Sequence, residues 1–460
     1  MFLNVTTLIK FVLLNLVFIM ALGSVLTWME RRQSAYIHDR VGPTRADIPM
    51  FGHKFTAWGL IHILADAVKS LFKEPFVPGS ADPGLFKLAP LIPFVVTMVV
   101  MALVPFGPDI RTIDVPFIGN WLVQNYPEYP VIPMQIARLD AGLLVAFAVS
   151  SLSIYGVALA GWASNNRYAM LGGLRAAAQA ISYEVALGLT VVGTFIVFGS
   201  TELAQIVRDQ SGGLFWGLPA WGIFVQPFGA MLFLVAGIAE SKRTPFDLPE
   251  GESEIVGFFL EYSSMAFALF MLSEYVEVAV LASIFTVLFF GGWQLPWIMG
   301  ESSLYLGFTS VELSSFWIGI LGFLVFCTKV FLLSAFQLQI RWTLPRFRYD
   351  QLMRLGWKNL LPLALVNIFV TAGLVWVDPT LKLSGYVGLG LVAIFAMVVI
   401  AGPKRVPAHA GHDAGHGHGA AHDAHAAHAG HTAHGDAHAP AAAGGDSVHG
   451  HAAAMPHPIS

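Results

Sequence analysis

Long apolar runs constrain this chain more than any other feature, because each is about as long as a lipid bilayer is thick. A hydrocarbon core of about 30 Å needs roughly 20 apolar residues in a helix. Only 12% of the residues are charged, whereas soluble domains carry about 25%. We therefore expect an all-α polytopic integral membrane protein. Nine apolar runs are candidate spans, at about 8–29, 86–106, 140–162, 181–199, 221–241, 257–292, 314–337, 360–377 and 385–401.

The sixth run is unusually long and leaves two interpretations open. A helix over 257–292 would measure about 54 Å at 1.5 Å per residue, so it is either one long tilted or kinked helix or two short spans that meet near Glu274. Counting it once places 18 Lys and Arg residues on one side of the membrane and five on the other. This asymmetry satisfies the positive-inside rule. We therefore expect nine transmembrane helices, with the N-terminus periplasmic and the C-terminus cytoplasmic.

Two segments outside the spans have distinct compositions. Residues 53–73 carry apolar side chains at helical spacing with lysines at the ends, which predicts a cytoplasmic amphipathic helix. Residues 403–460 are rich in Ala and Gly and hold 13 of the 16 histidines. Such a composition cannot form a core, so we expect a transmembrane domain over 1–402 followed by a disordered cytoplasmic tail. Loose binding of Ni²⁺ or Zn²⁺ by the tail is an alternative to a purely solvated role.

Some kinds of chemistry are disfavoured by the sequence. Cys327 is the single cysteine, so this chain alone should hold neither a disulfide framework nor a cysteine-ligated iron–sulfur cluster. The sequence contains neither a Walker A motif nor a GxGxxG motif after a predicted strand, so we expect no bound nucleotide. We predict no metal site, and we expect any redox cofactor to belong to partner proteins.

Carboxylates lie within or beside the apolar runs, where burial of a charge is costly. The acids in these positions are Glu184, Glu240, Glu261, Glu274 and Glu277. Ionisable residues within spans usually face a cavity or a partner and often mark proton pathways. The basic residues inside the predicted spans are Lys87 and Lys329, so acids outnumber them. We therefore favour a proton relay over fixed ion pairs, which are the structural alternative.

The connection "RTPFDLPEGESE" at 243–254 gathers four acids on the side that is otherwise basic. Its two prolines and Gly251 prevent a continuous helix and favour an ordered turn. Phe246 and Leu248 are embedded among the charges, which is unusual for a solvated acidic loop. We expect a water-filled acidic funnel that leads to Glu261, with the solvated loop as the alternative.

Five motifs occur in order: "ERRQSAYIHDRVGP", "ADAVKSLFKEP", "GWASNNRYAMLGGLRAAAQAISYE", "AESKRTPFDLPEGESEIVGFFLEY" and "PRFRYDQLMRLGWK". Together they resemble the H-subunit family of bacterial NADH-quinone oxidoreductase (respiratory complex I), equivalent to subunit 1 of the mitochondrial enzyme. The resemblance runs from about residue 8 to 377 and does not cover the ninth run or the tail.

The resemblance implies a membrane-arm subunit that forms the ubiquinone chamber with the peripheral arm and couples quinone reduction to proton translocation. The residues that it assigns to the quinone chamber are Glu30, Arg31, Asp66, Arg243, Phe246 and Asp247. Those that it assigns to the proton path are Glu184, Glu240, Glu250, Glu252, Glu254, Glu261 and Glu274. Arg346 would balance charge in a cytoplasmic loop.

The resemblance also implies partners and a location. The partners would be peripheral-arm quinone-site subunits, adjacent small membrane subunits and membrane lipid, without nucleic acid. Ubiquinone would be the substrate, FMN and iron–sulfur clusters would lie on partner subunits, and the location would be the bacterial inner membrane. Two alternatives remain open from the sequence. One is the homologous subunit of a membrane-bound hydrogenase or formate hydrogenlyase, and the other is a stand-alone ion transporter, although the halves show no internal similarity.

Overall fold

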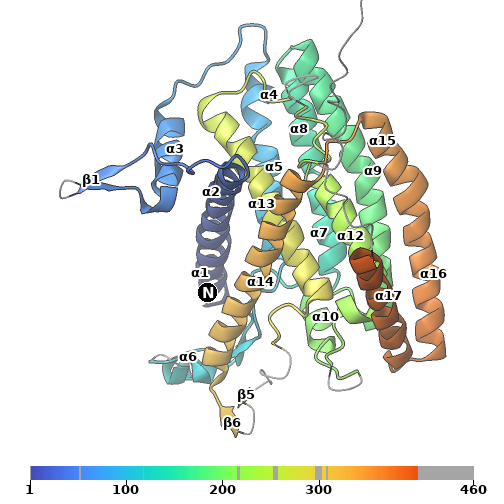
Figure 1. Ribbon diagram of the computed structural model, residues 1–460. Coiled ribbons are helices and arrows are strands. Elements are labelled where there is room, and N and C mark those ends of the chain that lie inside the picture. Colours follow the sequence, from blue (N-terminus) through green and yellow to red (C-terminus); the bar gives the residue numbers. More distant parts are fainter. Residues whose placement is uncertain are drawn as a thin grey trace, which may run out of the picture. The chain divides into compact units, whose positions relative to one another are not determined.

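The computed structural model describes residues 2–401 except 51–52, 118, 215–217, 252–256, 296–302 and 307–308. The predicted tail at 403–460 therefore lies outside the described residues. Helices dominate the described part (Figure 1). In chain order, the helices are α1 (Phe2–Lys10), η1 (Phe11–Ile19, a π-helix), α2 (Met20–Ile37), η2 (Ala57–Gly59), α3 (Ile61–Phe72), α4 (Pro83–Leu88), α5 (Leu91–Ala102), η3 (Thr112–Asp114), α6 (Gly119–Asn125), α7 (Gly142–Ser150), α8 (Ser153–Ala163), α9 (Arg167–Phe198), α10 (Leu203–Asp209), α11 (Gly222–Val225), α12 (Pro227–Glu240), α13 (Ser264–Phe289), α14 (Ser315–Thr343), α15 (Tyr349–Arg354), η4 (Leu355–Leu360), α16 (Leu361–Val377) and α17 (Lys382–Ala401).

The strands form three small antiparallel hairpins, all outside the helix bundle. They pair β1 (Ile48–Met50) with β2 (His53–Phe55), β3 (Ile110–Arg111) with β4 (Val131–Ile132), and β5 (Ser303–Leu306) with β6 (Thr309–Glu312). Backbone groups in lipid must be satisfied within the chain, so only helices are left to cross the membrane here.

The apolar runs predicted as spans correspond to helices. Within the described residues, seven helical segments are long and apolar enough to cross a membrane. They are Thr6–Ile37, Pro83–Ala102, Gly142–Ala163, Arg167–Phe198, Ser264–Phe289, Ser315–Thr343 and Tyr349–Val377. The fifth and ninth runs form the shorter apolar helices α12 and α17. The prediction of an all-α polytopic membrane protein is therefore confirmed.

α9 and α13 occupy the middle of the bundle. α9 packs against α8, α12 and α16, and α13 packs against α2, α5 and α14 (Figure 1). α9 starts at Arg167, well before the predicted start at 181, where the side chain of Asn166 accepts a hydrogen bond from the Tyr168 amide at 2.9 Å. It ends at Gly199, whose φ of +66° suits glycine. Most side chains of α13 beyond Ser273 are buried.

The long sixth run contains one continuous helix that is shorter than the run itself. α13 begins only at Ser264, and its 26 residues span about 39 Å. The Ser264 hydroxyl donates to the carbonyl oxygens of Ser70 and Lys73, at 3.0 and 2.7 Å. The backbone φ angle of Ser264 is +59°. These contacts tie the start of α13 to the end of α3. The expectation that Glu261 lies on the same helix as Glu274 was wrong, because Glu261 is in the turn before α13.

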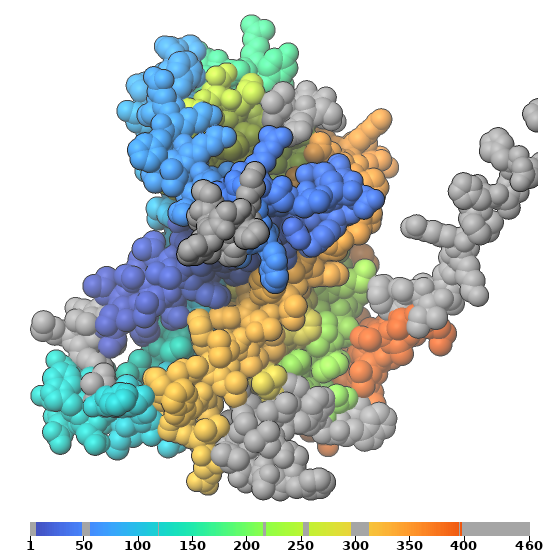
Figure 2. Space-filling view, turned by 60° about the vertical axis from the view of Figure 1, so that its left-hand side comes forward, coloured from blue at the N-terminus to red at the C-terminus, as the bar shows by residue number. Residues whose placement is uncertain are grey.

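The predicted amphipathic segment at 53–73 contains a shorter helix, α3, which packs against α2 and α13. None of its side chains is buried, and Leu64 and Phe72 are largely exposed. In Figure 2, residues of α1 and α2 (dark blue) lie against α14 (yellow to orange), although these helices come from opposite ends of the sequence. We refer below to the end of the bundle where α3 lies, at the top of Figure 1, as the α3 end.

Candidate functional site

The connection between α12 and α13 folds into the α3 end of the bundle instead of extending into solvent. Its charged side chains Lys242, Arg243 and Asp247 are all buried. Pro245 and Pro249 lack an amide N–H, so the segment cannot continue α12 as a helix and turns inward instead. The described part of the connection is therefore an ordered structure, and the solvated-loop alternative does not fit it.

Contacts with Gln179 and with Phe347 hold this connection in place. The Gln179 amide on α9 donates to the carbonyl oxygens of Ala239 and Phe246, at 2.6 and 2.7 Å. The Phe246 ring stacks on Phe347, with centroids 5.4 Å apart and an interplanar angle of 17°. The Phe347 amide also donates to the carbonyl oxygen of Pro245 at 3.1 Å. Phe246 is thus packed in the core and lines none of the hollows described below.

Glu30, near the end of α2, is buried and accepts from three donors that come from three other segments. Tyr275 on α13 donates its hydroxyl to Glu30 Oε2 at 2.9 Å. Arg243 Nη1 lies 3.4 Å from the same oxygen, and Arg341 on α14 donates to Oε1. Hydrogen bonds to charged groups are among the stronger ones in proteins. These contacts tie α2 to α13, to α14 and to the connection.

Arg243 connects Glu30 to a second buried carboxylate. Its Nη2 atom lies 3.4 Å from Glu274 Oε2, and its guanidinium lies 4.1 Å from the centroid of the Tyr275 ring. The side chain is 8% exposed, and taking a lone charge out of water to this degree would cost several kcal/mol. Two carboxylates and an aromatic face offset that cost. Arg243 therefore joins α2 to α13 electrostatically.

Asp247 and Glu250 extend this charged cluster along the connection. Arg346 Nη2 lies 2.9 Å from Asp247 Oδ2, and the Glu250 amide donates to Asp247 Oδ1 at 3.2 Å. Burial, and then the neighbouring Glu250, raise the pKa of Asp247 to about 7, against the opposing effect of Arg346. Burial and then Glu274 raise the pKa of Glu250 well above its ordinary value. Carboxyl groups that influence one another in this way titrate as a coupled set.

The cations near the buried carboxylates are not the ones that the sequence analysis counted inside the predicted spans. Lys87 is exposed, and the Lys329 ammonium donates to the carbonyl oxygens of Phe290, Gly292 and Gln294, at 2.8, 2.9 and 2.6 Å. Lys329 thus caps the end of α13 instead of pairing with an acid. The cations that contact the buried or half-buried carboxylates of this cluster are Lys242, Arg243, Arg341 and Arg346. Two of these come from the connection, so counting only residues within spans was wrong.

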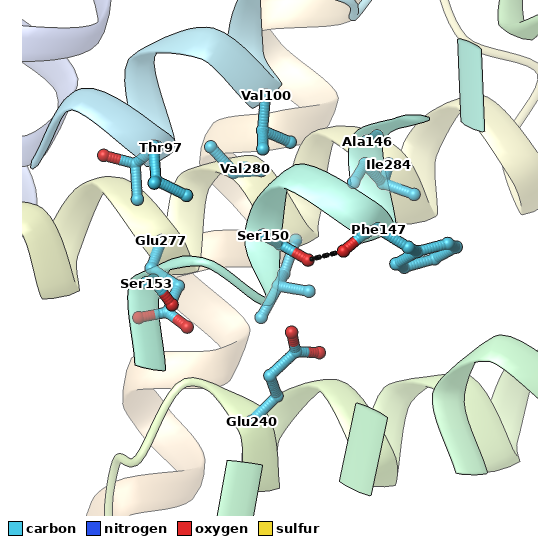
Figure 3. Close-up of a pocket in the computed structure, with 12 residues that line it drawn as sticks. Thr97, Val100, Ala146, Phe147, Ser150, Ser153, Glu240, Glu277, Val280 and Ile284 are labelled. Carbon is cyan, nitrogen blue, oxygen red and sulfur yellow. Dashed lines mark hydrogen bonds between the residues drawn. The ribbon is translucent and has the colours of Figure 1, made fainter. Parts of the chain in front are cut away.

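A small cavity lies below this cluster, between α5, α7, α8, α12 and α13 (Figure 3). Glu240 points into it from α12, and Glu277 reaches it from α13. Its volume is about 30 Å³. The residues that line it are Val96, Thr97, Val100, Ala146, Phe147, Ser150, Ser153, Glu240, Glu277, Val280, Leu281 and Ile284. Two carboxyl groups and three hydroxyl groups make it polar enough to hold water.

A larger hollow opens beside Glu30 at the α3 end. It measures about 260 Å³ and is lined by Glu30, Arg31, Ser34, Arg40, Pro43 and Trp342. Trp342 Nε1 is a buried donor that has no hydrogen-bond partner among the described residues. Buried polar groups are normally paired, so this unpaired donor in a residue that lines the hollow is unusual.

The remaining candidate residues lie outside the central cluster. Arg31 forms an ion pair with Asp66 on α3, and both side chains are nearly half exposed. Glu261 accepts from the Asn166 amide at 2.7 Å, away from the cavity. Glu184 on α9 is partly buried and interacts electrostatically with Glu240. Glu252 and Glu254 lie outside the described residues.

The structure also brings in residues that sequence reasoning did not assign. These are Lys242, Tyr275 and Arg341. Tyr275 follows Glu274 directly in the chain and carries a hydroxyl group, which was one sequence signal that it could belong to the site. The position of Arg341 near the end of a long apolar run was a signal that it could reach back into the bundle. The pairing of Lys242 with Glu277 had no signal in the sequence.

Comparison with known proteins gives a consistent result. Residues 9–372 match the family model described as NADH dehydrogenase. The chain is 39% identical over 390 residues to the NADH-quinone oxidoreductase H subunit of Bdellovibrio bacteriovorus, covering 80% of this chain and 96% of that protein. It is 39% identical over 368 residues to NADH-quinone oxidoreductase subunit 8 of Rhodothermus marinus, with the same coverage of 80% and 96%. It is 40% identical over 371 residues to the corresponding H subunit of Thermomicrobium roseum, covering 80% and 95%.

Proposed function

This chain belongs to the H-subunit family of NADH-quinone oxidoreductase, and on that premise we propose that it forms part of a ubiquinone chamber and couples quinone reduction to proton movement. The family makes it a membrane subunit of an enzyme complex whose other subunits are its partners. We propose that the nearest partners are peripheral-arm quinone-site subunits and adjacent small membrane subunits. FMN and iron–sulfur clusters would reside on those partners.

The hollow beside Glu30 suits a quinone headgroup in its chemistry. Quinone carbonyl oxygens are hydrogen-bond acceptors, and the free Trp342 Nε1 donor and the cations Arg31 and Arg40 border the hollow. Its volume of about 260 Å³ is close to the lower end of ligand pockets, roughly 300 Å³. The partner subunits would supply the rest of the chamber.

The observation that carries the coupling proposal is the continuous series of charged contacts leading away from this hollow. Glu30 in its wall contacts Arg243, and Arg243 contacts Glu274 in the middle of the bundle, each at 3.4 Å. Reduction of a quinone to a quinol adds two electrons and two protons. Negative charge that develops next to Glu30 acts strongly on these groups, because Coulomb interactions are little screened in a buried site.

The proton path would then run through the carboxylates behind Arg243. Asp247 and Glu250 lie beside the central cluster, and Lys242 interacts with both Glu274 and Glu240, which lines the cavity. Glu184 interacts with Glu240 and would receive the proton next. Glu252, Glu254 and Glu261 remain proposed members of the same path, on the strength of the family motif alone.

The orientation is also proposed. The distribution of Lys and Arg supports an α3 end in the cytoplasm, an N-terminus in the periplasm and a C-terminus in the cytoplasm of a bacterium. The membrane is then the inner membrane. The relatives described above are named as subunits of a quinone enzyme. The hydrogenase and transporter alternatives therefore have no observation in their favour.

Substitution of Trp342 by Phe tests the chamber. Loss of one hydrogen bond, worth about 1 kcal/mol, should raise the KM for quinone about fivefold without changing NADH oxidation by an artificial acceptor. Trp317→Phe is the matched control, because Trp317 is an exposed residue of the same helix. Arg40→Met is a second probe on an exposed side chain that borders the hollow. An unchanged quinone KM in both Trp342→Phe and Arg40→Met would contradict the chamber.

A further inference from the structure

Glu277 shares a cavity with Glu240 but is not one of the acids assigned to the path above. The two carboxyl groups come from different helices, α13 and α12, and both line the cavity in Figure 3. Thr97, Ser150 and Ser153 add hydroxyl groups to the same wall. The Ser150 hydroxyl donates to the carbonyl oxygen of Phe147 at 2.9 Å, so its own oxygen remains an acceptor facing the cavity.

Lys242 provides a positive charge behind Glu277. Its Nζ atom lies 3.5 Å from Glu277 Oε2, and the two side chains are 5% and 16% exposed. Burial acts to lower the pKa of Lys242, but its carboxylate neighbours, of which Glu277 contributes most, raise it above the ordinary value. Lys242 therefore remains an ammonium. It also interacts with Glu274 and Glu240, so it faces the carboxylates on both sides of the cavity.

We propose that Glu277 is a further proton-accepting carboxylate of this protein, and that Lys242 is the positioning residue that holds its carboxyl group at the cavity, where it can receive a proton from Glu240. The proposal rests on the proposed function and adds a step to it. Lys242 belongs to the connection that also carries Arg243, Asp247 and Glu250. Any displacement of that connection during quinone reduction would therefore move the ammonium relative to Glu277 and change the ability of Glu277 to hold a proton.

The step conserves atoms and charge. The O–H bond of protonated Glu240 breaks, and an O–H bond forms on the Glu277 carboxylate, so one acid becomes an anion as the other becomes neutral. A cavity of about 30 Å³ has room for a water molecule to relay that proton, since about 10–15 Å³ suffices for one. Lys242 keeps its proton throughout and contributes only its charge.

The competing explanation is a fixed ion pair that merely stabilises the fold. The two explanations differ in what a reversed pair would do. The double substitution Lys242→Glu/Glu277→Lys would keep an ion pair with its charges exchanged. It would leave no carboxylate at position 277. Removal of the acid in Glu277→Gln would likewise affect only stability in the strut explanation. A proton-accepting role requires a carboxyl group at position 277 even in a variant that is as stable as the wild-type protein.

The experiment uses the whole complex in proteoliposomes. We expect Glu277→Gln to lower kcat for coupled quinone reduction about tenfold with the quinone KM unchanged, because loss of a proton-transfer group affects turnover. Glu277→Asp should retain part of the activity, and the reversed pair should stay impaired. Glu202→Gln is the control, because Glu202 is a carboxylate paired with Arg138 elsewhere in the chain. NADH oxidation by an artificial acceptor reports assembly.

Each outcome decides between the explanations. Normal kcat in Glu277→Gln together with impaired Glu240→Gln would overturn this inference and leave the proposed path intact. Normal kcat in both variants would overturn the path itself. Restored activity in the reversed pair would show that Lys242 and Glu277 form only a strut. If Glu277→Gln fails to assemble, Glu277→Asp decides, since full activity with the shortened side chain would contradict a positioned acceptor.

Discussion

The Arg243 guanidinium lies 3.4 Å from the Glu274 carboxylate, and both side chains are 8% exposed. Arg243 belongs to the connection after α12, whereas Glu274 lies on α13 in the middle of the bundle. The same guanidinium lies 3.4 Å from Glu30 on α2. The charge of Arg243 thus offsets the cost of burying two carboxylates, and its contacts fix the connection against two helices.

Arg243→Met should destabilise the protein strongly. It leaves Glu274 without its arginine and removes one of the donors to Glu30, and breaking a buried pair typically costs about 3–5 kcal/mol. The matched control is Arg138→Met, because the Arg138 side chain is 44% exposed where it pairs with Glu202. Exposed pairs contribute about 1 kcal/mol or less. Thermal denaturation of the purified complex, followed through release of this subunit, measures both. Equal losses would mean that Arg243 is not a central strut.

Asp247 should make stability depend on pH near neutrality. Its pKa of about 7 in the folded protein lies above the ordinary 3.8, so the folded state binds more protons between these values. The stability from this carboxyl is complete below about pH 3.8 and is lost as pH rises through about 7.

Asp247→Asn cannot ionise and should flatten the fall in Tm between about pH 4 and about pH 7. The Arg346 side chain that it leaves is 38% exposed, so that cation stays hydrated. Denaturation of the wild-type and variant complexes across this range makes the measurement. If Tm depended on pH identically in the wild-type and variant complexes, Asp247 could not be uncharged at the lower end of the range.

Deletion of residues 408–460 should leave assembly and electron transfer unchanged. The segment is mostly Ala, Gly and His, which cannot bury enough apolar surface to pack. Quinone reductase activity of the truncated complex tests this, with loss of retention on a nickel column as a check that the histidines are gone. Loss of assembly would instead identify the tail as a docking element.

The helices could be predicted well because bilayer thickness dictates the length of apolar runs. The predicted start of the helix in the sixth run was too early. Ser264 is held by carbonyl groups at the end of α3, so Glu261 falls outside the helix. That restraint is a contact between distant segments, and no local propensity encodes it. The fifth run divides at Gln226, between α11 and α12, because Pro227 has no amide hydrogen and disfavours helical backbone in the residue before it.

The candidate site could be predicted only in part. The acidic residues were identifiable because charge is rare in lipid. Their partners were not, because Arg243 and Lys242 reach Glu274 and Glu277 through a tertiary fold of the connection. Reading Phe246 as a chamber residue followed its motif, whereas the structure uses its ring to pack against Phe347.

Carboxylates of the connection are proposed to couple quinone chemistry to the buried acids, and Glu250→Gln is the sharpest test of that coupling. The change removes one titratable carboxyl group next to Glu274 and Asp247 at nearly constant volume, so packing should survive. Quinone reductase activity and NADH oxidation by an artificial acceptor are measured in the same preparation. We predict that quinone reduction falls about tenfold while the artificial reaction is unchanged. Unchanged rates in both reactions would contradict the coupling.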